Sequence, residues 1–149
     1  MKKICILDYG LGNIKSLHNS LKKIGYKPNF YSEDKSSLYD VLFIPGVGSF
    51  NTAIKLLKEK NYFNLINNFN NQNTFIFGIC LGMQLLLSIG YEDKKNEGLN
   101  LIKGEAVKID QEFPIPIIGW NKVFINSNNK FTFLKKYNSE MFYFIHSYH

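Results

Sequence analysis

The chain has 149 residues, 45% of them hydrophobic and 20% charged, which fits one soluble globular domain with a single core. All 18 basic residues behind its net charge of +6 are lysines, whereas proteins that read bases or clamp phosphates usually use the bidentate arginine fork. No apolar stretch could span a bilayer, and Asp8 interrupts the apolar start too early for a signal peptide. We therefore expect a cytoplasmic protein that binds neither nucleic acid nor a membrane.

The first part of the chain predicts alternating strands and helices. Asn13 is a candidate N-cap, and Gly25 can end the first helix in a left-handed conformation. A near-continuous apolar run at 74–79 suggests a strand that is buried on both faces of a parallel sheet. In chain order we expect strands at 3–7, 28–31, 41–44 and 74–79, with helices at 14–24, 53–57, 63–69 and 83–89.

The later part of the chain predicts strands without intervening helices. A polar loop at 91–100 is followed by expected strands at 106–109, 120–125 and 141–145. This order predicts an open, mostly parallel α/β sheet of flavodoxin-like type, with helices on both faces and an antiparallel extension. We see no linker or repeat, so residues 1–149 are expected to form one domain.

The most informative stretch places Cys80 where the strand at 74–79 turns sharply into a helix. Gly78 and Gly82 flank the cysteine and remove side chains that would collide at so tight a bend. Such an elbow holds a nucleophile above the carboxyl ends of the strands, where open α/β sheets bind ligands. The following helix directs its positive end at the sulfur, which favours a thiolate nucleophile, and the Leu81 N–H would face an oxyanion at the attacked carbon. A buried structural cysteine is the competing interpretation.

A second glycine-rich loop, Pro45-Gly46-Val47-Gly48, also ends a predicted strand. Its bare backbone N–H groups could supply a second oxyanion donor, which favours the catalytic interpretation of Cys80. Cys5, the other cysteine, lies in an apolar run and is expected to be a buried thiol rather than a disulfide partner. The pattern calls for no metal and no cofactor.

Six segments, in collinear order over the whole chain, resemble the signatures of class I glutamine amidotransferases, specifically the glutaminase of imidazole glycerol phosphate synthase. Val47 narrows the resemblance to that glutaminase, because other class I amidotransferases usually carry a different residue there. The segments are 8–13 (DYGLGN), 45–50 (PGVGSF), 78–84 (GICLGMQ), 98–104 (GLNLIKG), 119–121 (GWN) and 146–148 (HSY).

The resemblance implies that Cys80 attacks the side-chain amide of glutamine, forms a glutamyl thioester and releases ammonia. It implies a (β/α)₈-barrel cyclase partner that uses the ammonia to make imidazole glycerol phosphate for histidine biosynthesis. It also implies three groups of site residues: Gly46, Val47, Gly48 and Leu81 as the oxyanion hole; Gln84, His146, Ser147 and Tyr148 around the glutamine; Gly10, Asn13, Trp120 and Asn121 at the cyclase interface.

Two departures from the family pattern matter. Ile117 stands where the family has a histidine, which could mark a paralogue with another partner. The family's catalytic base and its orienting acid lie in a His-Pro-Glu motif downstream of the His-Ser-Tyr signature, and this sequence has no His-Pro-Glu. We therefore expect a domain that is incomplete at its C-terminus and inactive or impaired as given, since a cysteine nucleophile of this kind needs a base.

Other interpretations stay open on the sequence alone. The chain could be a paralogous subunit that serves surface-sugar amidation, or a scaffold that has lost its base. A dinucleotide-binding loop at Gly10-Leu11-Gly12 is disfavoured because Lys15 stands where a third small residue is needed. A cysteine peptidase would share the elbow but not the Pro-Gly-Val-Gly loop or Gln84.

Overall fold

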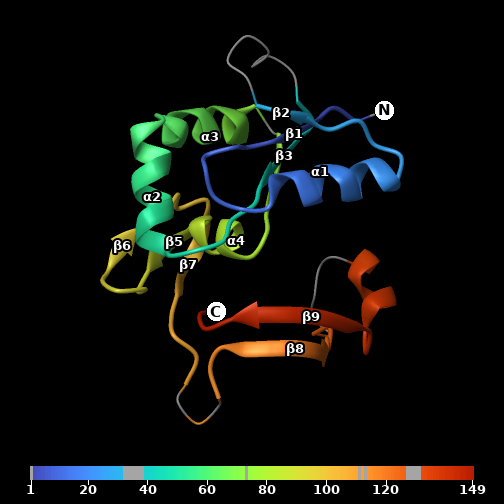
Figure 1. Cartoon of the computed structure of the whole chain (residues 1–149), viewed down its shortest axis with the longest axis vertical. Coiled ribbons are helices and arrows are strands. Elements are labelled where there is room, and N and C mark those ends of the chain that lie inside the picture. Colours follow the sequence, from blue (N-terminus) through green and yellow to red (C-terminus); the bar gives the residue numbers. More distant parts are fainter. Residues whose placement is uncertain (1, 32–38, 73, 111, 113, 127–131) are drawn as a thin grey trace. The chain divides into compact units, whose positions relative to one another are not determined.

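The computed structural model describes residues 2–31, 39–72, 74–110, 112, 114–126 and 132–149 (Figure 1). The chain divides into two compact units, Met1–Val107 and Lys108–His149, which we describe separately. That all 149 residues make up one domain stays a prediction. Within the described ranges, no helix is both long and apolar enough to cross a membrane.

The first unit is built on a four-stranded parallel sheet in the order β2-β1-β3-β4. Cys5 of β1 lies opposite Leu42 of β3, which in turn lies opposite Ile76 of β4. All four strands were predicted, with each end shifted by at most one residue. They are β1 (Ile4–Ile6), β2 (Asn29–Phe30), β3 (Val41–Ile44) and β4 (Phe75–Gly78).

Helices cover both faces of this sheet, as predicted, because alternate strand residues point to opposite sides. Helix α1 (Ile14–Lys23) packs on the face that carries Ile4 and Ile6. On the other face, Cys5, Leu7, Leu42 and Ile44 form the main core with residues from α2 (Phe50–Glu59) and α3 (Tyr62–Asn71). Figure 1 shows α1 apart from the α2–α3 pair, with the strands between them. The predicted sheet with two covered faces is confirmed.

Local capping explains where the first two long helices begin. The Asn13 side chain accepts a hydrogen bond from the Ser16 N–H at 3.1 Å, which confirms the predicted N-cap of α1. Gly25 follows the end of that helix with a φ of +91°, as expected of a left-handed helix end. Ser49 caps α2 in the same way, by accepting from the Thr52 N–H at 3.3 Å.

The prediction that the fourth strand is buried on both faces was wrong. β4 is the last strand in the described order, and Phe75 and Phe77 on one of its faces are 61% and 47% exposed. Ile76 on the other face packs against the main core. The cluster beneath α1 includes Val41 and Phe43 of β3 but no residue of β4, so the cover that α1 provides stops one strand short.

The predicted helix at 83–89 was also wrong in its extent. Helix α4 (Leu81–Leu85) has only five residues, and the chain then forms β5 (Leu87–Gly90). A continuous apolar run has no period that separates helix from strand, so pairing with other strands decides. β5 pairs antiparallel with β6 (Asn96–Glu97), inside the expected loop, and parallel with β7 (Ile102–Ala106), which replaces the strand predicted at 106–109.

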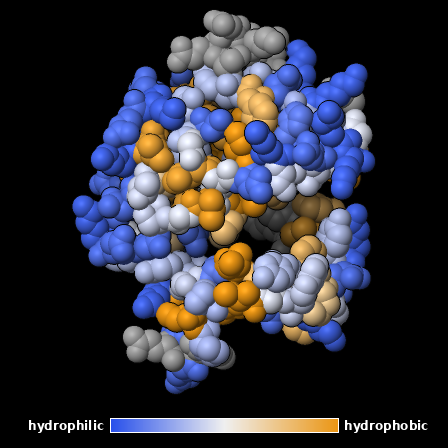
Figure 2. Space-filling view, in the orientation of Figure 1, coloured by the Kyte–Doolittle hydropathy of each residue, from blue (hydrophilic) through white to orange (hydrophobic). Residues whose placement is uncertain are grey.

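The second unit contains an antiparallel pair of strands, β8 (Ile117–Lys122) and β9 (Met141–His146). A 3₁₀ helix at Thr132–Tyr137 precedes β9. The expected strand at 141–145 is confirmed, whereas β8 begins three residues before the predicted 120–125 and ends three residues earlier. Most large hydrophobic side chains of these two strands are exposed. Figure 2 shows hydrophobic patches between hydrophilic ones on the face in view.

Core packing in the first unit gives a direct test. Ile66→Ala removes a fully buried side chain from α3 and should lower the free energy of unfolding by about 2–5 kcal/mol. Ile24→Ala is the matched control, since Ile24 is 68% exposed and its loss should change stability by less than about 0.5 kcal/mol. Urea denaturation of both variants measures the difference, and equal midpoints would contradict the described core.

Candidate active site

Three loops meet at the carboxyl ends of the parallel strands, where α/β sheets place their sites. They follow β1, β3 and β4 and consist of residues 8–13, 45–49 and 79–80. Gly12 of the first loop and Gly46 of the second lie so close that a Cβ on Gly12 would be 3.2 Å from the Gly46 N. A Cβ on Gly46 would in turn be 2.9 Å from the Gly82 N, at the start of α4.

Cys80 occupies a strained bend between β4 and α4, as the elbow motif predicted. Its φ of +54° and ψ of −120° are unusual for a residue with a side chain and are of the kind held in place at functional sites. The backbone around it supplies that support: the Ile79 N–H donates to the Ile44 carbonyl at 3.0 Å, and the Met83 N–H donates to the Cys80 carbonyl at 2.9 Å. The Cys80 side chain is exposed at the top of the bend.

The glycines on either side of Cys80 are required by close packing. A Cβ on Gly82 would overlap the carbonyl oxygen of Ile44 in β3. A Cβ on Gly78 would lie 2.5 Å from the Cα of Met83, across the bend. The elbow therefore depends on two contacts that only glycine allows, which is the role that the sequence predicted for them.

The loop at 45–48 presents backbone toward the same edge of the sheet. Gly48 has a φ of +111°, a conformation that favours glycine, and Val47 is 63% exposed. Leu81 is the first residue of α4, and the first N–H groups of a helix have no acceptor within the helix. Gly46 and Leu81 are neighbours, since a Cβ on Gly46 would be 3.0 Å from the Leu81 Cβ. The predicted oxyanion donors thus belong to one small region, although that role stays a prediction.

Two further residues of the first unit belong to this region. Gln84 is buried on α4, and its backbone N–H donates to the Cys80 carbonyl at 3.2 Å. The Glu92 carboxylate accepts a hydrogen bond from the Phe50 N–H at 2.6 Å and so holds the start of α2, directly after the glycine loop. Sequence reasoning missed Glu92, because it lies in a polar stretch with no local signal for a long-range contact.

The expected helix-dipole effect on Cys80 loses most of its basis, because α4 has a single short turn rather than the longer helix predicted. Of the expected interface residues, Asn13 already uses its side chain as the N-cap of α1. Gly10 is exposed, and its N–H donates to the Asp8 carboxylate at 3.1 Å. Their part in an interface stays a prediction.

The remaining predicted residues belong to the second unit. The His146 Nδ1 lies 2.9 Å from the Tyr148 carbonyl oxygen, and the Ser147 carbonyl accepts from the Ile109 N–H at 2.9 Å. Trp120 is 65% exposed on β8 and meets the Tyr143 ring edge-on at 5.8 Å. Asn121, beside it, is also exposed. A glutamine-binding role for 146–148 and an interface role for Trp120 and Asn121 stay predictions.

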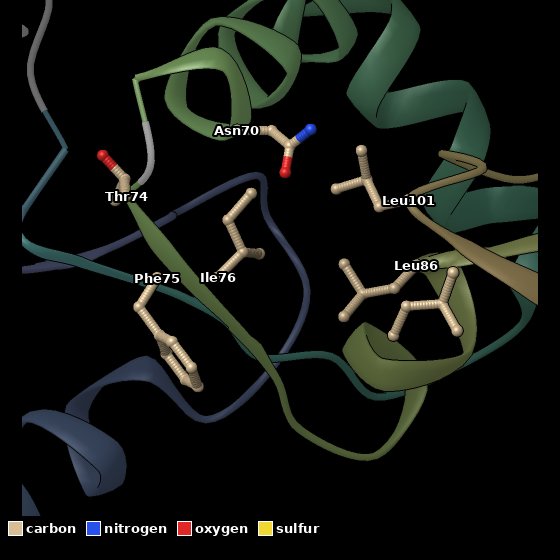
Figure 3. Close-up of a pocket in the computed structure, with 7 residues that line it drawn as sticks. Asn70, Thr74, Phe75, Ile76, Leu86 and Leu101 are labelled. Carbon is tan, nitrogen blue, oxygen red and sulfur yellow. The ribbon is translucent and has the colours of Figure 1, made fainter.

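A separate open hollow of about 350 Å³ lies beside β4 and is not the candidate active site. Its described lining residues are Asn70, Thr74, Phe75, Ile76, Leu86, Leu101 and Ile102, none of which has a charged side chain. Figure 3 shows Ile76 and Phe75 on opposite sides of the strand. Among the residues that the structure describes, no group of three or more His, Cys, Asp or Glu side chains could hold a metal ion.

Several known proteins are similar to this chain. A family model described as glutamine amidotransferase class-I matches residues 5–149. The imidazole glycerol phosphate synthase subunit HisH of Carboxydothermus hydrogenoformans is 39% identical over 145 residues, which cover 97% of this chain and 72% of that protein. The subunit HisH of Lactococcus lactis is 39% identical over 150 residues, 99% of this chain and 73% of that protein.

The chain belongs to the class-I glutamine amidotransferase family. A crystal structure of a glutamine amidotransferase matches the fold with a TM-score of 0.72, at 14% identity, over 95% of this chain and 70% of that one. Membership of this enzyme family and the α/β fold both confirm what the six sequence signatures predicted. The roles of the individual residues are the subject of the proposals below.

The two cysteines should differ sharply in reactivity. Cys5 is fully buried, and burial raises the pKa of its thiol to about 12, so at about pH 8 it is protonated and shielded. A diazo-ketone analogue of glutamine should therefore label exposed Cys80 and leave Cys5 unmodified, as read by peptide mapping. Labelling after unfolding in urea is the control and should reach both cysteines. Equal labelling of the folded chain, or labelling of Cys5 alone, would mean that the described elbow does not form.

Proposed function

We propose that this chain is the glutaminase subunit of an imidazole glycerol phosphate synthase, with Cys80 as the nucleophile. The observation that carries the proposal is the strained, exposed Cys80, in a bend that lies against the glycine loops at 8–13 and 45–49. The HisH relatives, 39% identical over almost the whole chain, support this subunit among the members of the family. Because these relatives are named as a subunit of that synthase, we infer that the enzyme contains a second subunit.

The first step is attack by the Cys80 thiolate on the side-chain carbonyl carbon of glutamine. A carbon–sulfur bond forms, and the carbonyl oxygen becomes an oxyanion. We propose that the Leu81 N–H and the N–H groups of the Gly46–Val47–Gly48 loop donate to it, which is the kind of preorganised stabilisation that lowers such barriers most. Gln84, buried beside the elbow, would help to hold the glutamine head group.

In the second step the carbon–nitrogen bond breaks. The nitrogen takes a proton and leaves as ammonia, and Cys80 keeps the glutamyl group as a thioester. Water then adds to the thioester carbon and gives up a proton, releasing glutamate and the cysteine. Ser147 and Tyr148 would line the glutamine pocket together with His146, as the resemblance implies.

Both steps need a group that moves protons, and the His-Pro-Glu motif that supplies it in the family does not occur in these 149 residues. The His146 Nδ1 lies 2.9 Å from the Tyr148 carbonyl oxygen, two residues further along the chain. The resemblance assigns His146 no role as the base. We therefore propose that a polypeptide of these 149 residues alone turns glutamine over slowly.

We further propose that the partner is a (β/α)₈-barrel cyclase that receives the ammonia, and that the pair works in the cytoplasm in histidine biosynthesis. Gly10, Asn13, Trp120 and Asn121 are the proposed contact residues. Exposure of Trp120 supports this assignment, since large aromatic side chains are frequent anchors of interfaces.

Glutamate release tests the glutaminase proposal. This chain should hydrolyse glutamine at least about a hundredfold more slowly than the Lactococcus lactis HisH relative, the usual scale for lost general base catalysis. Cys80→Ser should abolish the remaining activity, and Cys5→Ser, the matched control, should leave it unchanged. Release that does not depend on Cys80 would refute the proposed nucleophile. A rate near that of the relative would show that another group in this chain acts as the base.

The partner assignment is tested at Trp120. Trp120→Ala should weaken binding to the cyclase subunit of the same organism by about 2 kcal/mol or more, because buried aromatic anchors dominate interfaces. Its melting temperature should stay nearly unchanged, since the side chain is 65% exposed. A core tryptophan would instead cost about 3–5 kcal/mol of folding stability. Phe124→Ala, at a residue 74% exposed just beyond β8, is the control for nonspecific loss of apolar surface. Normal affinity with a lowered melting temperature would remove Trp120 from the interface.

A further inference from the structure

Tyr9 is a buried residue that the catalytic signatures leave without a role. It directly precedes Gly10 in the loop after β1, and its side chain is fully buried. Its hydroxyl is the one buried side-chain polar atom in the described residues that has no hydrogen-bond partner. A buried hydroxyl without a partner is unfavourable, and a phenylalanine would fill the same space without it. The hydroxyl therefore needs a functional explanation.

The position of that hydroxyl supplies one. The Tyr9 Oη lies against Gly46, where a Cβ would be only 2.6 Å from it. The same point is 2.9 Å from the Gly82 N and 3.0 Å from the Leu81 Cβ. The hydroxyl thus lies beneath the contact between the proposed oxyanion loop and the elbow, and glycine at position 46 is what leaves room for it.

Electrostatics connects the same hydroxyl to the nucleophile. Burial, and after it the negative charge of Cys80, raise the pKa of the Tyr9 phenol. When Cys80 is a thiolate, Tyr9 therefore keeps its proton and can act on that charge only as a neutral O–H dipole. Two acidic side chains already accept backbone hydrogen bonds: Asp8, on the first loop, from Gly10, and Glu92, which follows β5, from Phe50. Cys5, on the strand before Tyr9, is fully buried.

We propose that Tyr9 is a positioning residue whose phenol O–H stabilises the Cys80 thiolate from beneath the Gly46 loop. The inference rests on the proposed function in that Cys80 is the nucleophile. The Tyr9 O–H has no hydrogen-bond partner, Cys80 included, so its dipole acts on the thiolate through space, and burial strengthens such an interaction by lowering the local dielectric constant. Tyr9 itself exchanges no proton with glutamine.

The test is the pH dependence of Cys80 alkylation by iodoacetamide, which requires neither glutamine nor a partner. Tyr9→Phe removes one oxygen and its O–H dipole, and should lower the alkylation rate at about pH 7 by about threefold and move the whole rate curve to higher pH by roughly half a pH unit. Its urea midpoint should be unchanged or higher, because an unpaired buried hydroxyl is removed. Peptide mapping assigns the label to Cys80.

Tyr39→Phe is the matched control. Tyr39 also has a raised phenol pKa, from burial and then from the charge of Cys5 rather than Cys80, so its loss should leave Cys80 alkylation unchanged. An unchanged curve in Tyr9→Phe, or the same shift in Tyr39→Phe, would overturn the proposal.

A second variant covers the case in which Tyr9→Phe does not fold. Site-specific 3-fluorotyrosine at position 9 keeps the side chain and makes its O–H a stronger donor, so the curve should move to lower pH. No movement overturns the proposal. If the alkylation curve shifts in Tyr9→Phe but glutamate release does not depend on Cys80, the glutaminase function alone is refuted. If glutamate release depends on Cys80 but the curve does not shift, the role of Tyr9 alone is refuted.

Discussion

The contact between Gly82 and the carbonyl oxygen of Ile44 is the constraint on which the site depends. Any side chain at position 82 would overlap that carbonyl. Because glycine has none, the first turn of α4 can pack directly on the end of β3. The same carbonyl accepts the hydrogen bond of the Ile79 N–H, which sets where β4 ends. These two interactions leave the chain only the bend at Cys80, with its positive φ, to pass from strand to helix.

The packing of the parallel sheet extends this constraint to the neighbouring loops. Because β1, β3 and β4 are parallel, their carboxyl ends lie at one edge. The loops after β1 and β3 contain glycines, and the bend after β4 leads into Gly82 of α4. Gly12, Gly46 and Gly82 then let three backbones approach one another without intervening side chains. Backbone N–H groups are the donors that acyl-transfer chemistry needs, so the packing and the proposed chemistry require the same residues.

The two units contribute differently. The first unit carries Cys80, the proposed nucleophile, together with the glycine loops and the main core. The second carries a two-stranded ribbon with exposed aromatic residues and the predicted glutamine-lining segment at 146–148. A two-stranded ribbon has little core of its own. Its exposed Trp120 therefore suits a surface that binds another molecule, which agrees with an enzyme that works as a subunit.

The sequence by itself determined the family, the parallel α/β core and the elbow, because short local residue patterns predict each of them. Gly78, Cys80 and Gly82 predict a bend, Asn13 predicts a helix start, and the short apolar runs of β1 and β3 predict strands. The structure alone decided the length of α4 and the identity of β5, because the apolar run after Cys80 fits helix and strand equally well and only pairing with β6 and β7 selects the strand. It also decided the exposure of Phe75 and Phe77, which depends on how far α1 reaches. Only the structure showed that Glu92 and the Tyr9 hydroxyl lie near the site, because each contacts a residue far from it in the sequence.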